Sequence, residues 1–143
     1  MSSQFAKLAV VHWALIAGNN AYTLNRMYNE LHDAEIHNLV GELREIQSHL
    51  NDLELWFHDP RITRLQPREA NDMETGIAAC TTSLGKLDEI VKSVTALKRA
   101  EPTSRVWGEI KATFKPLEGP VFDRLNAHRI WLTQLFPILK MHL

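Results

Sequence analysis

The sequence contains a single cysteine, Cys80, among its 143 residues. One thiol cannot close an intramolecular disulfide or build a thiolate zinc site, so disulfide-rich secreted scaffolds and zinc-finger modules are excluded. Cys80 lies on the apolar side of an expected helix, where we interpret it as a small core residue rather than a nucleophile. This cysteine usage is typical of a reducing compartment, and we expect a cytoplasmic location.

Long apolar runs are also missing. The most apolar stretch, residues 5–17, has about 13 residues and contains Lys7 and His12, whereas a membrane-spanning helix needs about 20 apolar residues. It lacks the basic segment and the cleavage site of a secretion signal. We therefore expect it to form a helix of the core.

A strong net charge is absent, since the chain carries −1 at neutral pH. This balance and the lack of a helix-turn-helix pattern argue against nucleic acid as a partner. The composition, 45% hydrophobic and 23% charged, is that of a globular protein, and we expect residues 1–143 to form one domain. The most basic stretch, residues 92–115, suits either an anionic membrane surface or an ordinary solvated surface.

Catalytic motifs are missing as well. The sequence has no Gly-x-Ser-x-Gly turn, no phosphate-binding or dinucleotide glycine loop, and no His-Glu-x-x-His or Glu-x-x-His metal pattern among its seven histidines. We therefore predict no catalytic residues, no metal ligands and no cofactor. A catalytic arrangement of residues distant in sequence stays open, so an enzyme is disfavoured without being excluded.

What the sequence does have is a repeat of apolar residues at alternating steps of three and four in three stretches. The repeat comprises Ile36, Leu39, Val40, Leu43, Ile46, Leu50, Leu53 and Phe57, then Met73, Ile77, Cys80, Leu84, Leu87, Val91 and Val94, then Val121, Leu125, His128, Leu132, Leu135 and Leu139. This spacing places the residues on one face of a helix, and such faces must be buried against each other. The sequence predicts an all-α fold, an antiparallel bundle of four to five main helices.

Prolines, glycines and capping residues set the expected helix boundaries. The expected helices are 3–24, weakened at Gly18-Asn19-Asn20, then 34–57, 68–97, a short helix ending at Phe114, and a last helix from Pro120 to about 139, bent or ended near Pro137. Thr103 or Ser104 is the expected N-cap of the short helix before the last.

Aromatic residues and one seam histidine suggest a ligand pocket. His128 lies on the apolar seam of the last helix, close in sequence to Trp131, and Trp56 ends another seam. A partly buried histidine with a hydrogen-bonding partner is one interpretation, and a pocket for an apolar ligand, lined by His128, Trp131 and Trp56, is the other. The second interpretation predicts a small-molecule-binding or catalytic helical bundle.

The order of motifs carries a family resemblance over about two-thirds of the chain. An apolar seam runs into Asp59-Pro60-Arg61, a seam from Ile77 to Leu87 follows, and after a basic loop come Trp107, Phe114-Lys115-Pro116-Leu117 and the segment from Leu125 to Leu132 with Arg129. This order resembles the fungal HeLo-like domains, the N-terminal helical modules of nucleotide-binding receptors and cell-death proteins.

The resemblance implies a non-catalytic signalling or cell-death domain that acts by self-association. It implies two further partners, a nucleotide-binding receptor module and an anionic membrane surface to which the cytoplasmic protein is recruited. The candidate membrane or self-association residues lie on the first helix and are Phe5, Leu8, Val11, Trp13, Leu15 and Ile16. The alternative for this helix is that it simply fills the centre of the bundle.

Overall fold

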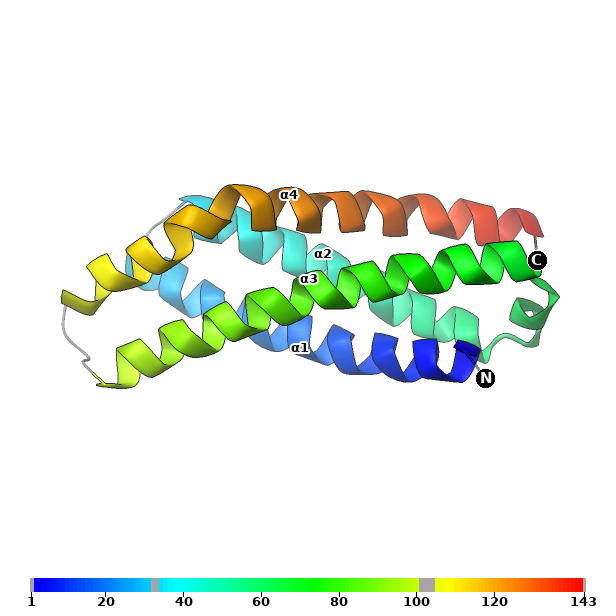
Figure 1. The fold of residues 1–143 in the computed structure, drawn as a ribbon, viewed down its shortest axis with the longest axis horizontal. Helices are drawn as coiled ribbons and strands as arrows, with labels where there is room; N and C mark the ends of the chain where they lie inside the picture. The colour runs from blue at the N-terminus through cyan, green and yellow to red at the C-terminus, as the bar shows by residue number, and fades with distance from the viewer. Residues whose placement is uncertain (1, 32–33, 101–104, 143) are drawn as a thin grey trace.

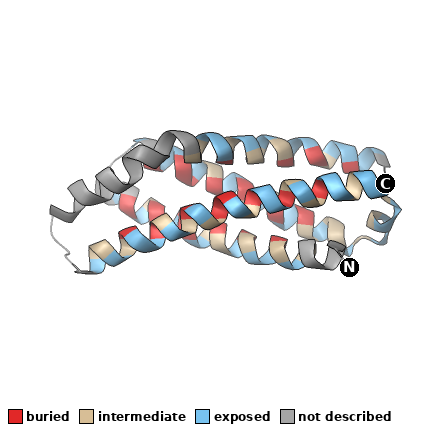
Figure 2. Ribbon diagram, in the orientation of Figure 1, coloured by how far each residue is buried: buried red, intermediate tan, exposed pale blue. Residues whose placement is uncertain are grey.

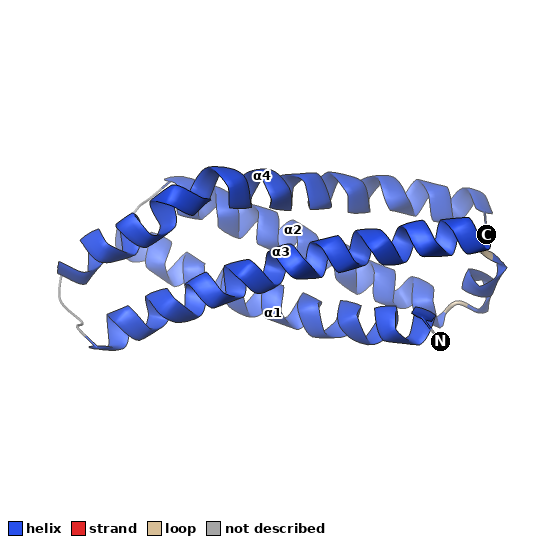
Figure 3. Ribbon diagram, viewed as in Figure 1, coloured by secondary structure: helices blue, strands red, loops and turns tan. Residues whose placement is uncertain are grey.

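Four long helices joined by short connections make up the protein (Figure 1). The computed structural model describes the backbone of residues 2–31, 34–100 and 105–142, and their side chains outside 2–6, 28, 30–31, 35, 100, 105–120 and 142. The elements are α1 (Ser2–Leu31), α2 (Ala34–His58), the 3-10 helix η1 (Pro60–Arg64), α3 (Pro67–Ala100) and α4 (Arg105–His142). The predicted all-α bundle is confirmed, and Figure 3 shows only helices and loops over the described part of the chain.

The helices form an up-down-up-down bundle. α1 packs against α2 and α3, and α4 packs against α3 and α2, so α2 and α3 occupy diagonal positions although they are consecutive in sequence. Glu42 and His49 of α2 bond to Arg129 and Thr133 of α4 in the same order, which shows that α2 and α4 run parallel. Both chain ends lie at the same end of the bundle (Figure 1).

The core consists of the predicted seams together with an inner face of α1. Every seam residue is buried except Phe57, Val121 and His128, which are partly buried (Figure 2). α1 contributes Val10, Ala14, Ala17, Ala21, Leu24 and Met27. The inward red positions of all four helices in Figure 2 therefore form one continuous core.

Small residues bring α1 and α2 closer together than any other helix pair. Ala14, Ala17 and Ala21 are buried, and a Cβ atom at Gly18 would overlap the side chain of Gln47. Short side chains allow two helix backbones to approach each other, so the small residues of α1 serve the packing inside this bundle.

α1 is continuous through residues 18–20, where the sequence predicts a weak point. Asparagine weakens a helix when its side chain competes for the backbone, but Asn20 is buried and its Nδ2 donates to Asp88 Oδ1 of α3 at 3.2 Å. Because this hydrogen bond to α3 occupies the Asn20 side chain, the side chain does not compete for the hydrogen bonds of the α1 backbone.

The connection between α2 and α3 contains η1. Asp59 caps this element, because its Oδ1 accepts from the Arg61 backbone N–H at 2.9 Å while its carboxylate also pairs with the Arg61 guanidinium. These hydrogen bonds lower the pKa of Asp59 to about 2. Pro60 starts η1 and Pro67 starts α3, positions at which proline loses no helical hydrogen bond.

The predicted short helix before the last is wrong, because Arg105–His142 is one helix, α4. A proline inside a helix removes one hydrogen bond and bends the backbone, and the helix continues where both sides remain helical. In Figure 1, α4 changes direction between its yellow and orange parts, the region that contains Pro116 and Pro120. α4 also continues through Pro137, and the predicted caps Thr103 and Ser104 lie outside the described residues.

Candidate interaction surface

The outward face of α1 exposes four large apolar side chains. Leu8, Leu15 and Tyr22 are 65%, 63% and 65% exposed, and Val11 is 43% exposed. Residues 8, 15 and 22 are seven positions apart, which is two helical turns, so these side chains lie above one another along the helix. We call these four residues the α1 stripe.

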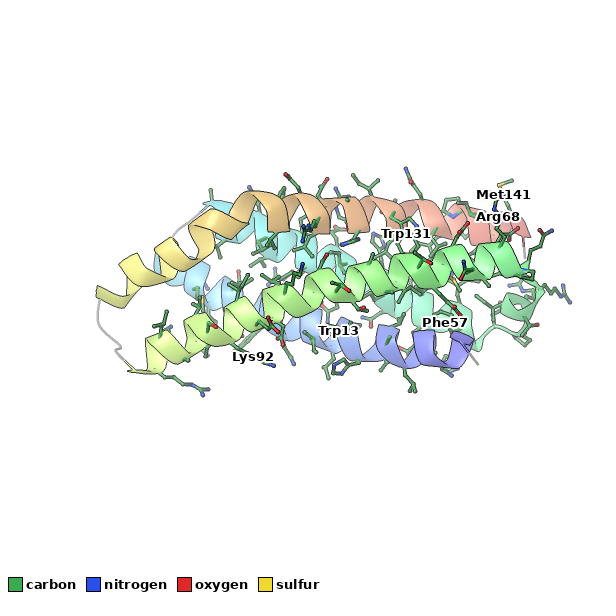
Figure 4. All side chains as sticks on the ribbon, viewed as in Figure 1. Trp13, Phe57, Arg68, Lys92, Trp131 and Met141 are labelled. Atoms are coloured by element: carbon green, nitrogen blue, oxygen red, sulfur yellow. The ribbon has the colours of Figure 1, made fainter. Side chains whose placement is uncertain are left out.

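The α1 stripe is outward because the other sides of α1 are already occupied. Gly18 lies against Gln47 of α2, Ala14 and Ala17 are buried in the core, and Trp13 lies beside Gly85 of α3 (Figure 4). A helix with partners on two sides still has a third side facing solvent, and in α1 that side carries Leu15 and its neighbours.

Charged residues, which normally cover a solvent-facing helix side, are missing here. No Asp, Glu, Lys or Arg occurs from residue 8 to residue 25, and the flanking cations are Lys7 and Arg26. The exposed sides of the other helices carry charges, for example Arg44 and Glu45 in α2, Lys86 and Glu89 in α3, and Asp123 and Arg124 in α4. His12 and Asn19 are the exposed polar residues among the stripe positions. An exposed apolar patch with so few polar side chains is typical of an interaction site.

The structure divides the candidate residues of the first helix into two groups. Leu8, Val11 and Leu15 are exposed, whereas Trp13 and Ile16 are partly buried toward α3. The side chain of Phe5 lies outside the described residues. Tyr22 was missed by the sequence reasoning, and its seven-residue spacing from Leu15 and Leu8 is the signal that could have found it.

Within the described ranges, no helix is apolar over a stretch long enough to cross a bilayer.

The seam histidine of α4 has a hydroxyl partner. His128 Nε2 and Ser83 Oγ of α3 lie 2.8 Å apart and share a hydrogen bond. Burial, with a smaller contribution from the cation of Arg124, lowers the pKa of His128 below its ordinary value of 6.5. The imidazole is therefore held in its neutral form as a link between α3 and α4.

Of the three residues predicted to line a ligand pocket, His128 and Trp131 lie one turn apart on the side of α4 that faces α3, and Trp56 lies elsewhere. Trp131 is on the α3–α4 side, where its indole occupies the space that a Cβ atom at Gly76 would need (Figure 4). Trp56 lines an open hollow between the C-terminal parts of α2 and α4, beside Phe136. From the hydrogen bonds that set the α2–α4 register, Trp56 and Trp131 are about nine to twelve residues, or about 14–18 Å, apart along the bundle. The ligand-binding interpretation stays a prediction.

A second open hollow lies between α1 and α3. Its centre is polar, because Asp88 accepts from the buried Asn20 and forms an ion pair with Lys92 at 2.9 Å. These groups satisfy one another, so they are best explained as the polar contact that aligns α1 with α3.

Cys80 and the acidic and histidine side chains bear on two further kinds of site, a reactive thiol and a metal centre. Burial raises the pKa of the Cys80 thiol to about 12, so the thiolate is disfavoured at neutral pH. In the part of the chain that the structure describes, no three His, Cys, Asp or Glu side chains are grouped so that they could hold a metal ion.

Comparison of the chain with family models, curated proteins and solved structures gives no match.

Proposed function

We propose that the protein is a non-catalytic helical interaction domain that works by self-association through the α1 stripe. The observation that carries the proposal is the exposed side of α1 from Leu8 to Tyr22, which presents four large apolar side chains and no Asp, Glu, Lys or Arg, in a bundle whose other apolar seams are buried. Burying one exposed leucine stabilises a complex by about 1.5–3 kcal/mol before the cost of association, so a few such side chains give a reversible contact.

The biological role we propose is signalling of the cell-death type, with a nucleotide-binding receptor module as the partner that brings copies together. The resemblance to HeLo-like domains supports this role, because those domains act by oligomerisation. Tethering copies raises their effective concentration to the millimolar range, which suffices to populate a weak contact. The proposal therefore needs no chemistry in the bundle itself.

A membrane surface is the other candidate partner of the α1 stripe. Helices that lie on anionic membranes combine an apolar face with Lys and Arg on the polar face. α1 has no such cations between residues 8 and 25, whereas six of the sixteen Lys and Arg residues of the chain lie in residues 92–115. Self-association is therefore favoured over membrane contact.

Self-association is tested by sedimentation equilibrium or light scattering over about 1–500 µM protein. We expect a concentration-dependent increase in mass for the natural chain and its loss in Leu15→Glu. Leu55→Glu is the matched control, because Leu55 is a 70% exposed leucine on α2, outside the α1 stripe. We expect it to associate like the natural chain.

Two results would contradict the proposal. The first is a natural chain that stays monomeric over the whole range, and the second is equal loss of association in Leu15→Glu and Leu55→Glu. Co-sedimentation with phosphatidylcholine–phosphatidylserine vesicles identifies the membrane alternative. Binding by a monomeric natural chain that Leu15→Glu abolishes would replace self-association with membrane contact.

A further inference from the structure

The hollow between α1 and α3 has the size of a small-molecule site. Its volume is about 780 Å³, and such sites have volumes of roughly 300–1,000 Å³. Seven of the ten residues that line it are polar or charged and none is aromatic, which disfavours an apolar or a flat aromatic ligand. No residue of the α1 stripe lines it, so the proposed self-association does not use this hollow.

Two threonines present hydrogen-bond acceptors to the hollow. Thr23 Oγ1 donates to the carbonyl oxygen of Asn19 at 3.0 Å, and Thr95 Oγ1 donates to that of Val91 at 2.8 Å. A hydroxyl group whose proton is bound within its own helix keeps its oxygen lone pairs as acceptors. Because both threonines line the hollow, a ligand there has to supply the protons of any hydrogen bond to them.

Asn20 and Asp88 add acceptors from the inner wall of the hollow. Asn20 is only 5% exposed and its Nδ2 donates to Asp88, but no hydrogen bond between described residues reaches its Oδ1. The Asp88 carboxylate accepts from Asn20 and Lys92 and still has lone pairs left. A buried polar oxygen needs a hydrogen-bond donor, so this wall also suits a ligand that carries hydroxyl groups.

Two cations line the same hollow and leave it with a net charge of +1. Lys92, labelled in Figure 4, is paired with Asp88, so the two charges balance. Arg99 lies seven residues farther along α3 and is exposed, and no ion pair between described residues involves it. A guanidinium group binds a carboxylate through two parallel hydrogen bonds. The one unbalanced cation therefore suits a ligand with a single negative charge.

We propose that this hollow binds a sugar acid, a small molecule that carries several hydroxyl groups and one carboxylate. The hydroxyl groups donate to Asn20 Oδ1, to Asp88 and to the threonine oxygens. The carboxylate is bound by Arg99, with Lys92 beside it. This binding site is separate from the α1 stripe and gives the bundle a second function, recognition of a polar anion.

The spacing along α3 fits a ligand with its hydroxyl groups and its carboxylate at opposite ends. Residues 88 and 99 are about 16 Å apart along the helix axis, and Thr95 lies between them, about 6 Å before Arg99. The long side chain of Arg99 spans the distance back to Thr95. The aliphatic side chains of Ile16 and Val91 also line the hollow and suit the C–H groups of a sugar chain.

An amino acid is the less suitable anion, because its ammonium group would have to bind Asp88. Lys92 already balances the charge of that carboxylate at 2.9 Å and would repel a second cation there. Neutral hydroxyl groups meet the same acceptors without this repulsion. The choice between a hydroxyl group and an ammonium group therefore favours the sugar acid.

Titration of the natural chain with sodium gluconate, followed by ¹H–¹⁵N NMR, tests the site. We expect a dissociation constant of about 1 mM, because a small polar ligand in an open site gains little affinity per atom. The shifted amides should lie in residues 16–23 and 88–99. Glucose lacks the carboxylate and acetate lacks the hydroxyl groups, so each should bind at least about tenfold more weakly.

Arg99→Gln tests the carboxylate contact, and we expect it to weaken gluconate binding about tenfold. Lys86→Gln is the matched control, because it removes one exposed cation from α3 outside the hollow. It should bind gluconate like the natural chain. Equal weakening in both variants would show an effect of overall charge and overturn the site.

Thr95→Val tests the hydroxyl contacts, and we expect it to weaken gluconate binding about threefold. Thr82→Val is its control, since Thr82 also donates to its own helix, at the Ala78 carbonyl oxygen, and does not line the hollow. The NMR spectrum of each variant shows whether the bundle is folded. Equal affinities of the two valine variants would overturn the contact of the ligand with Thr95.

The other probes define the ligand class. Acetate binding as tightly as gluconate would overturn the sugar acid in favour of a simple anion contact, and tighter binding of glucose 6-phosphate would overturn the carboxylate in favour of a phosphate. Absence of shifts with every probe up to about 20 mM, or shifts confined to other residues, would overturn the site. None of these results depends on whether the chain self-associates.

Discussion

At the scale of single residues, the bundle is most sensitive where one side chain fills the space left by another. Trp131 lies over Gly76, and the backbones of α3 and α4 can approach there only because Gly76 has no Cβ atom. The neighbour of Gly18 is the flexible side-chain amide of Gln47, which can move to make room for an added methyl group. The cost of a methyl group therefore depends on whether its neighbour is a rigid ring or a movable amide.

Gly76→Ala is expected to lower the free energy of unfolding by about 1–3 kcal/mol, because the methyl group displaces the Trp131 indole. Gly41→Ala on α2 is the matched control, since nothing lies within 4 Å of its added Cβ. It should stabilise the protein by about 0.5–1 kcal/mol through helix propensity. Urea unfolding followed by circular dichroism measures both, and two equal effects would contradict the assigned position of Trp131.

His128 makes stability depend on pH. Its folded-state pKa is lowered, so the folded state binds this proton less well than the unfolded chain does. The stabilisation is fully present above the ordinary pKa of 6.5 and is lost as the pH falls from there toward the lowered value. We expect a smaller unfolding free energy at about pH 5.5 than at about pH 7.5.

His128→Gln tests this assignment, because glutamine can bond to Ser83 and does not titrate. Urea unfolding at both pH values should show a smaller pH dependence in His128→Gln than in the natural chain. An unchanged pH dependence in the variant would assign the effect to other groups.

At the scale of helices, polar bonds between helices fix the register that apolar seams leave loose. Glu42 of α2 accepts from Arg129 Nε at 2.7 Å and from Asn126 Nδ2 at 3.1 Å, so one carboxylate holds two consecutive turns of α4. Apolar seams repeat at every turn and carry little directional information, whereas this arrangement around Glu42 exists in only one register. The contact between Asn20 and Asp88 aligns α1 with α3 in the same way.

Arg129→Met and Glu42→Gln are expected to be less stable than the natural chain, with a coupling energy of about 1 kcal/mol between the two sites. The ion pair is partly shielded from water, which keeps the coupling above that of a fully exposed pair. A double-mutant cycle in urea unfolding measures it. Additive effects would show that the pair contributes nothing to the α2–α4 contact.

At the scale of the whole molecule, α1 takes part both in the folded core and in the proposed contact between copies of the chain. Its inner side belongs to the core, so it is expected to stay in the bundle while its outer side contacts a second copy. Binding that requires the folded state stabilises that state by mass action. Association and thermal stability should therefore change together.

We expect the melting temperature of the natural chain to rise with protein concentration between about 5 and about 500 µM. In Leu15→Glu the melting temperature should not depend on concentration, because the contact is lost while the core is untouched. Differential scanning calorimetry over the series measures both. A concentration-independent melting temperature of the natural chain would argue against a dimer of folded protomers.

The sequence predicted the helices and their buried sides, because apolar spacing of three and four depends on the geometry of a single helix. Leu43, Leu84 and Leu132 are buried as their seams predict. The single continuous α4 was not predicted, since Pro116 and Pro120 weaken a helix locally without deciding whether it continues. The ligand site suggested by His128 depended on partners from other helices, and Ser83 could not be chosen from spacing alone.

The sequence by itself determined that this chain forms a helical bundle and which residues face inward in α2, α3 and the last part of α4. Only the tertiary structure decided that α2 and α3 are diagonal, that the small residues of α1 serve its contact with α2, and that Leu8, Leu15 and Tyr22 remain outside. The physical reason is that α1 is apolar on nearly every side, so its periodicity does not say which side is covered. The positions of α2 and α3 around α1 make that choice.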